Sequence, residues 1–421
     1  MLRALPFLLL AVPAAAQEKP DPEKLKASVE KLVSFGTRHT LSSADDPKRG
    51  IGAARRWVGA ELAKMGDQCG CIEVANIGRG FTGPRAPNGV EIVDVLGFQA
   101  GTDPKRVVIV MGHIDSRVTD VMDATSDAPG ANDDASGVAL VLEAARILSK
   151  EKFAATIVYA ALSGEEQGLF GGQLLAETAK ARGWTVSAVL NNDIVGNTVG
   201  TDGTRVADRV RVFSESLSEA DSIEAQMAKR NDGSEDDGPS RALAKVIDGV
   251  AAKLPGGLDV FLVRRPDRFG RGGDHSPFLK LGYPAVRFTV GIENYDAQHQ
   301  TLRQGYGDTP DKMDFPYLAK VTAINVATIR RLASAPAAPA QVTIGGALST
   351  DTSVKWAAVP GAAGYRIRWR RADAQDWTGQ RDVTGTEAVL KGVVVDDNFI
   401  GVSALAADGS ESLVTFGGRG G

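Results

Sequence analysis

Residues 20–334 alternate between short, unbroken apolar runs and longer stretches with helical spacing. The unbroken runs are rich in β-branched side chains and lie at 106–112, 155–162, 187–190 and 285–290. Residues 136–150 and 314–332 instead repeat apolar side chains at helical intervals. Apolar strands separated by helices are typical of a mostly parallel sheet whose two faces are both covered. The sequence therefore predicts an α/β fold, a three-layer αβα sandwich with the sheet in the middle.

A Pro/Ala-rich segment divides the chain after this region. Residues 335–340, which end the run ASAPAAPA, predict a linker between two domains. Residues 341–421 then hold short strand-like runs bounded by turn residues and no helical repeat, which is typical of a small all-β sandwich. This second domain could pack on the first or bind a substrate or a surface. Its arginine-rich run is expected on a solvated face; the residues are Arg366, Arg368, Arg370 and Arg371.

The N-terminal residues have the features of a secretory signal peptide. Arg3 precedes an apolar run at 5–12, and small residues follow at 14–16. We therefore expect cleavage after Ala16, a first domain over residues 17–334, and a protein that is secreted or periplasmic. The sequence has no other long apolar run, so no membrane span is expected in the mature chain.

Composition excludes several classes of partner. Lys and Arg total 48 against 52 for Asp and Glu, a net charge of −4, so neither nucleic acid nor an anionic membrane is expected. Two cysteines are too few for a disulfide scaffold. In an oxidising compartment Cys69 and Cys71 could form a bridge, although a bridge across one residue is strained. Two free thiols are an alternative, and a zinc site would need a second pair of ligands.

Acidic and histidine residues gather where predicted strands end or near those ends. In chain order they are His113, Asp115, Asp133, Asp134, Glu165, Glu166, Asp193 and His299. Open α/β sheets bind ligands at the carboxyl ends of their strands. Buried carboxylates are unfavourable unless they are paired or bound to a metal. Mixed nitrogen and oxygen donors without thiolate suit Zn²⁺, with Mn²⁺ or Co²⁺ as alternatives.

Each cluster taken alone has a simpler explanation. Asp133 or Asp134 could cap a helix, and Glu165 with its neighbour could form an acidic first helical turn. Asp193 could form an Asx turn, and His299 could lie on the rim of a pocket. Three clusters at strand ends together favour a metal centre over coincidence.

The most specific segments are NDDASG at 132–137 and GEEQGL at 164–169. Further motifs are GHIDS (112–116), PGANDDASGVA (129–139), SGEEQGLFGG (163–172), NNDIVGN (191–197), DHSPFLKLGYPAV (274–286) and QHQT (298–301). With these motifs, residues 20–334 resemble the co-catalytic di-zinc exopeptidases. That group includes bacterial leucyl aminopeptidases, glutamate carboxypeptidases, glutaminyl cyclases and the transferrin receptor ectodomain. The resemblance implies their mixed, mostly parallel sheet.

The C-terminal residues resemble a fibronectin type III module. The residues at its core positions are Trp356, Tyr365 and Leu390.

The di-zinc resemblance implies a role for each residue of the cluster. Two zinc ions would be bound, with Asp133 bridging both, and the full ligand set would be His113, Asp133, Glu166, Asp193 and His299. His113 and Asp193 would complete the shell of one ion, and Glu166 and His299 that of the other. Glu165 would be the general base, and Asp115 would orient the His113 imidazole. The Asp133–Asp134 peptide bond is cis in relatives.

Three further residues are expected near the substrate. His275, within DHSPF, is expected to shape the pocket rather than bind metal. Several relatives carry Tyr directly before the last histidine ligand, where it donates to the oxyanion. Here that position is Gln298, and Tyr295 is an alternative donor.

As a whole, the sequence predicts a zinc-dependent aminopeptidase that acts on peptides. The resemblance implies a water activated between two cations, with Glu165 carrying its proton to the leaving amine. A carboxypeptidase or dipeptidase, a glutaminyl cyclase and a non-catalytic binding protein are the alternatives. The complete ligand set disfavours the last two, because such cyclases keep one zinc and a binding protein would have lost ligands.

Overall fold

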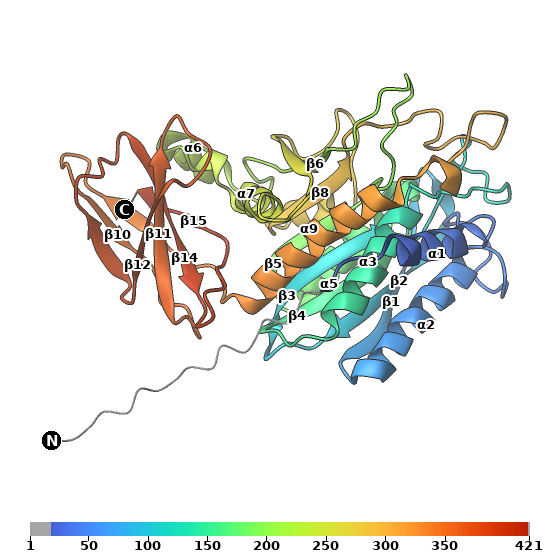
Figure 1. The fold of residues 1–421 in the computed structure, drawn as a ribbon, viewed down its shortest axis with the longest axis horizontal. Coiled ribbons are helices and arrows are strands. Elements are labelled where there is room, and N and C mark those ends of the chain that lie inside the picture. The colour runs from blue at the N-terminus through green and yellow to red at the C-terminus, as the bar shows by residue number, and fades with distance from the viewer. Residues whose placement is uncertain (1–17, 420–421) are drawn as a thin grey trace.

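The computed structural model describes residues 18–419, so the signal-peptide prediction for residues 1–16 lies outside the described residues. A large α/β unit is followed by a smaller β-sandwich (Figure 1). The helices are α1 (Pro22–Val33), α2 (Ile51–Cys69), α3 (Ala135–Leu148), α4 (Glu165–Gly168), α5 (Phe170–Ala181), α6 (Ile223–Asp232), α7 (Pro239–Ala251), α8 (Ser276–Leu279) and α9 (Phe315–Ser334).

Strands β1 to β8 form the sheet of the α/β unit. They are β1 (Ile72–Gly83), β2 (Ala86–Gln99), β3 (Asp103–His113), β4 (Ala155–Leu162), β5 (Thr185–Asn192), β6 (Arg209–Phe213), β7 (Asp259–Val263) and β8 (Ala285–Val290). The spatial order is β1-β2-β4-β3-β5-β8-β6-β7. Strands β4, β3, β5 and β8 run parallel, while the β1–β2 hairpin and the β6–β7 pair join this centre antiparallel. The predicted mostly parallel, mixed sheet is confirmed.

Both faces of the central strands are buried, as the unbroken apolar runs predict. On β3, Val108 and Val110 pack in one core with residues of α1, α2, α3, α7 and α9. Val107 and Ile109 point to the opposite face and pack with residues of α5 and α8. Figure 1 shows α1, α2, α3 and α9 together over the first of these faces. The three-layer αβα sandwich is therefore confirmed.

Two helices begin where their sequences provide a capping aspartate. Asp134 accepts a hydrogen bond from the backbone N–H of Gly137 at the start of α3. Asp314 accepts one from Tyr317 at the start of α9. Such caps satisfy backbone donors that a helix leaves free at its first turn. The cap of α3 fixes the start of that helix beside the carboxyl end of β3, because Asp134 also accepts from the N–H of His113.

The cysteines are joined, which decides between the alternatives for them. Cys69 ends α2 and forms a disulfide with Cys71.

In the described part of the chain, no helix has the length and apolar character that a membrane crossing requires.

The C-terminal unit is a sandwich of two four-stranded sheets. Its strands are β9 (Thr343–Gly345), β10 (Thr352–Lys355), β11 (Gly364–Arg371), β12 (Gly379–Val383), β13 (Glu387–Leu390), β14 (Asn398–Leu405), β15 (Thr415–Phe416) and β16 (Gly418–Arg419). Trp356, Tyr365 and Leu390 lie in its core, with the two aromatic rings 5.4 Å apart. The expected linker at 335–340 lies between the end of α9 and the start of β9.

The arginine-rich strand β11 faces the α/β unit through one of its side chains. Arg370 is fully buried and pairs with Asp237, which lies just before α7. The prediction of a solvated face was wrong for this residue, because its partner lies far away in the sequence. It was only partly right for Arg366 and Arg368, whose side chains are 22% and 17% exposed. Arg371 is exposed, as predicted.

A second contact between the two units centres on Glu411. This buried carboxylate accepts from Arg368 of β11 and lies 3.5 Å from Arg331 of α9. Arg366 of β11 is 3.2 Å from the same carboxylate. The sandwich is thus tied to the last helix of the α/β unit by paired charges.

Candidate active site

A cavity of about 360 Å³ opens at the carboxyl ends of the parallel strands. Its lining residues are Arg85, Arg117, Asp133, Glu165, Glu166, Gly168, Leu169, Asp193, Arg268, Gly270, Arg271, Gly272 and His299. They come from segments that are far apart in the sequence. Five of the six predicted catalytic and metal-binding residues line this cavity, and the sixth, His113, lies in the adjoining side-chain group.

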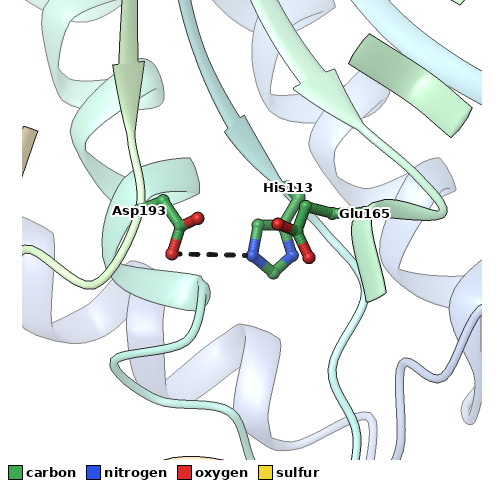
Figure 2. Close-up of side chains that lie close together, drawn as sticks. All are labelled: His113, Glu165 and Asp193. Carbon is green, nitrogen blue, oxygen red and sulfur yellow. Dashed lines mark ion pairs between the residues drawn. The ribbon is translucent and has the colours of Figure 1, made fainter. Parts of the chain in front are cut away.

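Three strand ends supply the first group of side chains. His113 is the last residue of β3, Glu165 is the first residue of α4 shortly after β4, and Asp193 directly follows β5. Their potential ligand atoms lie within 4.8 Å of one another. Figure 2 shows the three side chains turned toward one space. His113 Nε2 lies 4.0 Å from Asp193 Oδ1.

Asp133, Glu166 and His299 form the second group. His299 Nε2 lies 2.8 Å from Asp133 Oδ2 and 3.0 Å from Glu166 Oε1. The other oxygen of Asp133, Oδ1, is 3.2 Å from His113 Nε2. Asp133 therefore stands between the two groups, with one carboxylate oxygen toward each.

Asp115 and Asp134 support the residues of these two groups. The Asp115 carboxylate accepts hydrogen bonds from the backbone N–H groups of Gly164 and Glu166, so it fixes the turn that carries Glu165. His113 Nδ1 lies 3.0 Å from the main-chain oxygen of Asp115 and 3.6 Å from its carboxylate. Asp134 follows Asp133 through a cis peptide bond.

The electrostatics of the site favour a positive charge in it. Although burial opposes protonation of His299, Glu166 and Asp133 raise the pKa of His299 to about 10. Burial alone would raise the pKa of Asp133, but His299 and His113 hold it well below its ordinary value. Burial, together with neighbouring carboxylates, raises the pKa of Glu165 well above its ordinary value.

The donor set fits divalent metal ions. His113 is buried, and its Nε2 has no hydrogen-bond partner among residues 18–419, although it faces the Asp133 carboxylate. A buried nitrogen that has no hydrogen bond and lies next to carboxylates is typical of a metal ligand. Imidazole and carboxylate donors suit zinc. Glu165 belongs to the first group and lies close enough to His113 and Asp193 to be a ligand itself, which the sequence did not predict.

The structure also identifies site residues that the sequence reasoning missed. Asp308 accepts hydrogen bonds from the backbone N–H groups of Asn132 and Asp133, so it holds the loop that presents Asp133. Arg287 of β8 is fully buried, and its Nη2 lies 2.8 Å from Asp193 Oδ1. A charged residue inside an otherwise apolar strand was the available signal for Arg287.

Neither His275 nor Tyr295 lines the cavity, which corrects the expected pocket. His275 is fully buried, with Nε2 2.7 Å from the carbonyl oxygen of Pro266. Tyr295 is 58% exposed, and its backbone N–H donates to Thr201. Gln298 reaches the site, since its side-chain amide donates to Asp133 Oδ2 at 3.2 Å.

The fold and the site together define a metallopeptidase with the architecture of the zinc exopeptidases. The sequence profile of Peptidase family M28 matches residues 94–329, and the chain belongs to this family. A probable zinc metalloprotease of Leptosphaeria maculans is 42% identical over 414 residues, which are 96% of each chain. One of Pyricularia oryzae is 42% identical over 419 residues, covering 95% of this chain and 83% of the other. The chain is therefore a zinc metallopeptidase.

Solved structures show the same fold at low sequence identity. A leucine aminopeptidase precursor from Bacteroides thetaiotaomicron has a TM-score of 0.55 and 16% identity, covering 75% of this chain and 99% of that one. A glutaminyl cyclase from Porphyromonas gingivalis has a TM-score of 0.53 and 18% identity, covering 74% and 99%. At this level of sequence identity the similarities show the fold alone.

Proposed function

We propose that this chain is a secreted or periplasmic aminopeptidase that removes N-terminal residues from peptides. The observation that carries the proposal is the position of Asp133 between two groups of metal-ligand type, in a cavity that also contains Glu165. Paired sites of this kind act in peptide hydrolysis among other displacements. The complete set of side chains favours a peptidase over a cyclase.

His113, Asp133 and Asp193 would hold one zinc ion, and Asp133, Glu166 and His299 would hold the other. Zinc supplies Lewis-acid chemistry when bound, because it polarises a carbonyl and lowers the pKa of water. These five side chains would supply the protein ligands of both ions, because Asp133 of the second group also faces His113 of the first.

Glu165 would move the proton. Its carboxylate belongs to the first group and lines the cavity, so it can accept a proton from an attacking water there and pass it to the leaving amine. Arg117 donates to Glu166 Oε2 at 2.7 Å, and Asp115 fixes the backbone of the same turn. These contacts hold the turn in place while the side chain of Glu165 transfers the proton.

Export is proposed from the N-terminal sequence pattern. The bond between Cys69 and Cys71 supports it, since such bonds persist in oxidising compartments. Fractionation of cells that express the full chain, together with N-terminal sequencing of the product, tests this part. A product that stays in the cytoplasm with Met1 in place would contradict it.

A mass-spectrometric time course tests the reaction. The zinc-loaded protein is given one peptide with a free N-terminus, the same peptide N-acetylated, and a version that begins with Gln. Shortening from the free N-terminus only, stopped by a chelator, is the expected result. Shortening of both forms from the C-terminus would instead make the protein a carboxypeptidase, and loss of ammonia without cleavage would make it a cyclase.

A further inference from the structure

Four arginine side chains line the same cavity as the candidate metal ligands. Arg85 lies between β1 and β2, Arg117 follows β3, and Arg268 and Arg271 lie between β7 and α8. We call these four residues the rim arginines. Three separate segments therefore bring guanidinium groups to one small cavity.

The rim arginines change the charge of the cavity. The lining carboxylates are those of Asp133, Glu165, Glu166 and Asp193, so carboxylates and rim arginines are equal in number. Divalent cations held by these carboxylates would add positive charge that nothing else in the cavity lining balances. A cavity with a net positive charge attracts anionic ligands, and more strongly where the surroundings exclude water.

Two rim arginines are only partly neutralised by other contacts. Arg85 donates to the main-chain oxygen of Glu166 at 2.7 Å and makes no ion pair among residues 18–419. Arg271 lies 2.8 Å from Glu293, a nearly buried carboxylate. Glu293 is shared with Arg268 and with Arg211 outside the cavity, so three guanidinium groups face that one carboxylate. The side chain of Arg271 remains 32% exposed.

We propose that the rim arginines, chiefly Arg85 and Arg271, bind a carboxylate of the peptide substrate close to the scissile bond. The enzyme would then prefer anionic peptides. Guanidinium groups suit this task because they bind carboxylates through paired hydrogen bonds. The carboxylate would come from an Asp or Glu side chain or from the C-terminus of a dipeptide. This inference rests on the proposed peptidase function.

Matched peptide pairs test the inference and separate the two sources. Values of kcat/KM are measured for Glu against Gln at the first position, for Glu against Gln at the second position, and for a dipeptide acid against its amide. We expect at least one acid to exceed its neutral partner about tenfold or more. The preference should weaken at high salt, because screening reduces the attraction. Equal values within all three pairs would overturn the inference.

Variants assign the preference to the rim arginines. Arg271→Gln and Arg85→Gln should each lower the acid-to-neutral ratio several-fold. Arg79→Gln removes the same charge from β1 in the surface pair with Glu177, outside the cavity lining, and should leave the ratio unchanged. The same fall in ratio for Arg79→Gln would show that overall charge is responsible and would overturn the assignment.

A binding measurement separates this inference from the proposed function. The same pairs are titrated calorimetrically into the Glu165→Gln variant, where turnover is not needed for a signal. Tighter binding of an acid, without cleavage of any peptide by the unaltered protein, would support the carboxylate site and contradict the aminopeptidase. Cleavage of neutral peptides, together with equal binding of the acid and neutral partners, would support the aminopeptidase and contradict the carboxylate site.

Discussion

Arg287 and Asp193 form a buried ion pair beneath the cavity, with Arg287 Nη2 2.8 Å from Asp193 Oδ1. Arg287 lies on β8, and Asp193 follows β5, the neighbouring parallel strand. The other terminal nitrogen of Arg287, Nη1, is 3.2 Å from Asp267 Oδ2. The guanidinium group of Arg287 thus holds Asp193, a proposed metal ligand, in place. It also neutralises the negative charges of Asp193 and Asp267 in a region that excludes water.

Replacing Arg287 with Met should destabilise the protein strongly. The change leaves Asp193 and Asp267 without this buried partner, and removal of one member of a buried ion pair costs about 3–5 kcal/mol. We expect the free energy of unfolding of the metal-free protein, from urea denaturation, to fall by about that amount. Arg205→Met is the control, because Arg205 is 67% exposed in its pair with Asp314. Its effect should be about 1 kcal/mol or less. Equal losses for the two variants would contradict the role given to the buried pair.

The central strands were predictable because both of their faces are buried. Burial on two faces produces the unbroken apolar runs that became β4 and β8 at the predicted bounds. The hairpin β1–β2 was not predicted, since much of β1 is exposed and its sequence IEVANIGRGFTG lacks such a run. The role of Arg287 was not predictable, because its single charge in the β8 run has partners, Asp193 and Asp267, that are distant in sequence.

Site residues were predictable where they follow a strand or belong to a specific motif. His113 ends a strand, Glu165 and Asp193 follow strands, and the structure gathers the three, although their ligand and base roles stay predictions. Asp308 gave no local signal, because its function is to accept hydrogen bonds from a loop about 175 residues earlier. The burial of Arg370 likewise depends on a partner in the other structural unit.

Glu165→Gln should lower kcat by about 10²–10⁴-fold while zinc remains bound. Glutamine keeps the size of the side chain but does not accept the proton from water. Zinc content by plasma mass spectrometry and turnover on the same sample provide the measurement. Turnover near that of the unaltered protein would contradict the general-base role, and loss of one zinc equivalent would make Glu165 a ligand instead.

Asp133→Ala should reduce the zinc content and abolish activity. Asp133 stands between the two groups, so its loss removes an oxygen donor from each. Asp120→Ala, at an exposed loop position, is the control and should retain the full zinc content. If the Asp133 variant bound as much zinc as the control, the shared-ligand role would be wrong.

The contact around Glu411 should make stability depend on pH in the acid range. Burial alone would raise the pKa of this carboxylate, but hydrogen bonds from Arg368 and Ser403 and the charge of Arg331 lower it to about 2 from an ordinary 4.5. Since the folded pKa is the lower one, the stabilisation is present above about pH 4.5 and is lost as pH falls toward 2. The shift corresponds to a free energy on the order of 3 kcal/mol.

Glu411→Gln isolates this contribution. A glutamine resembles the protonated acid, so the variant should be less stable than the unaltered protein near pH 7 and about equally stable near pH 2. Glu387→Gln is the matched control, because Glu387 is 69% exposed in its pair with Lys355 on the same sandwich. Urea denaturation followed by tryptophan fluorescence between pH 7 and the acid limit of folding measures the difference. A difference that stays constant across this range would mean that the charge of Glu411 does not stabilise the folded protein.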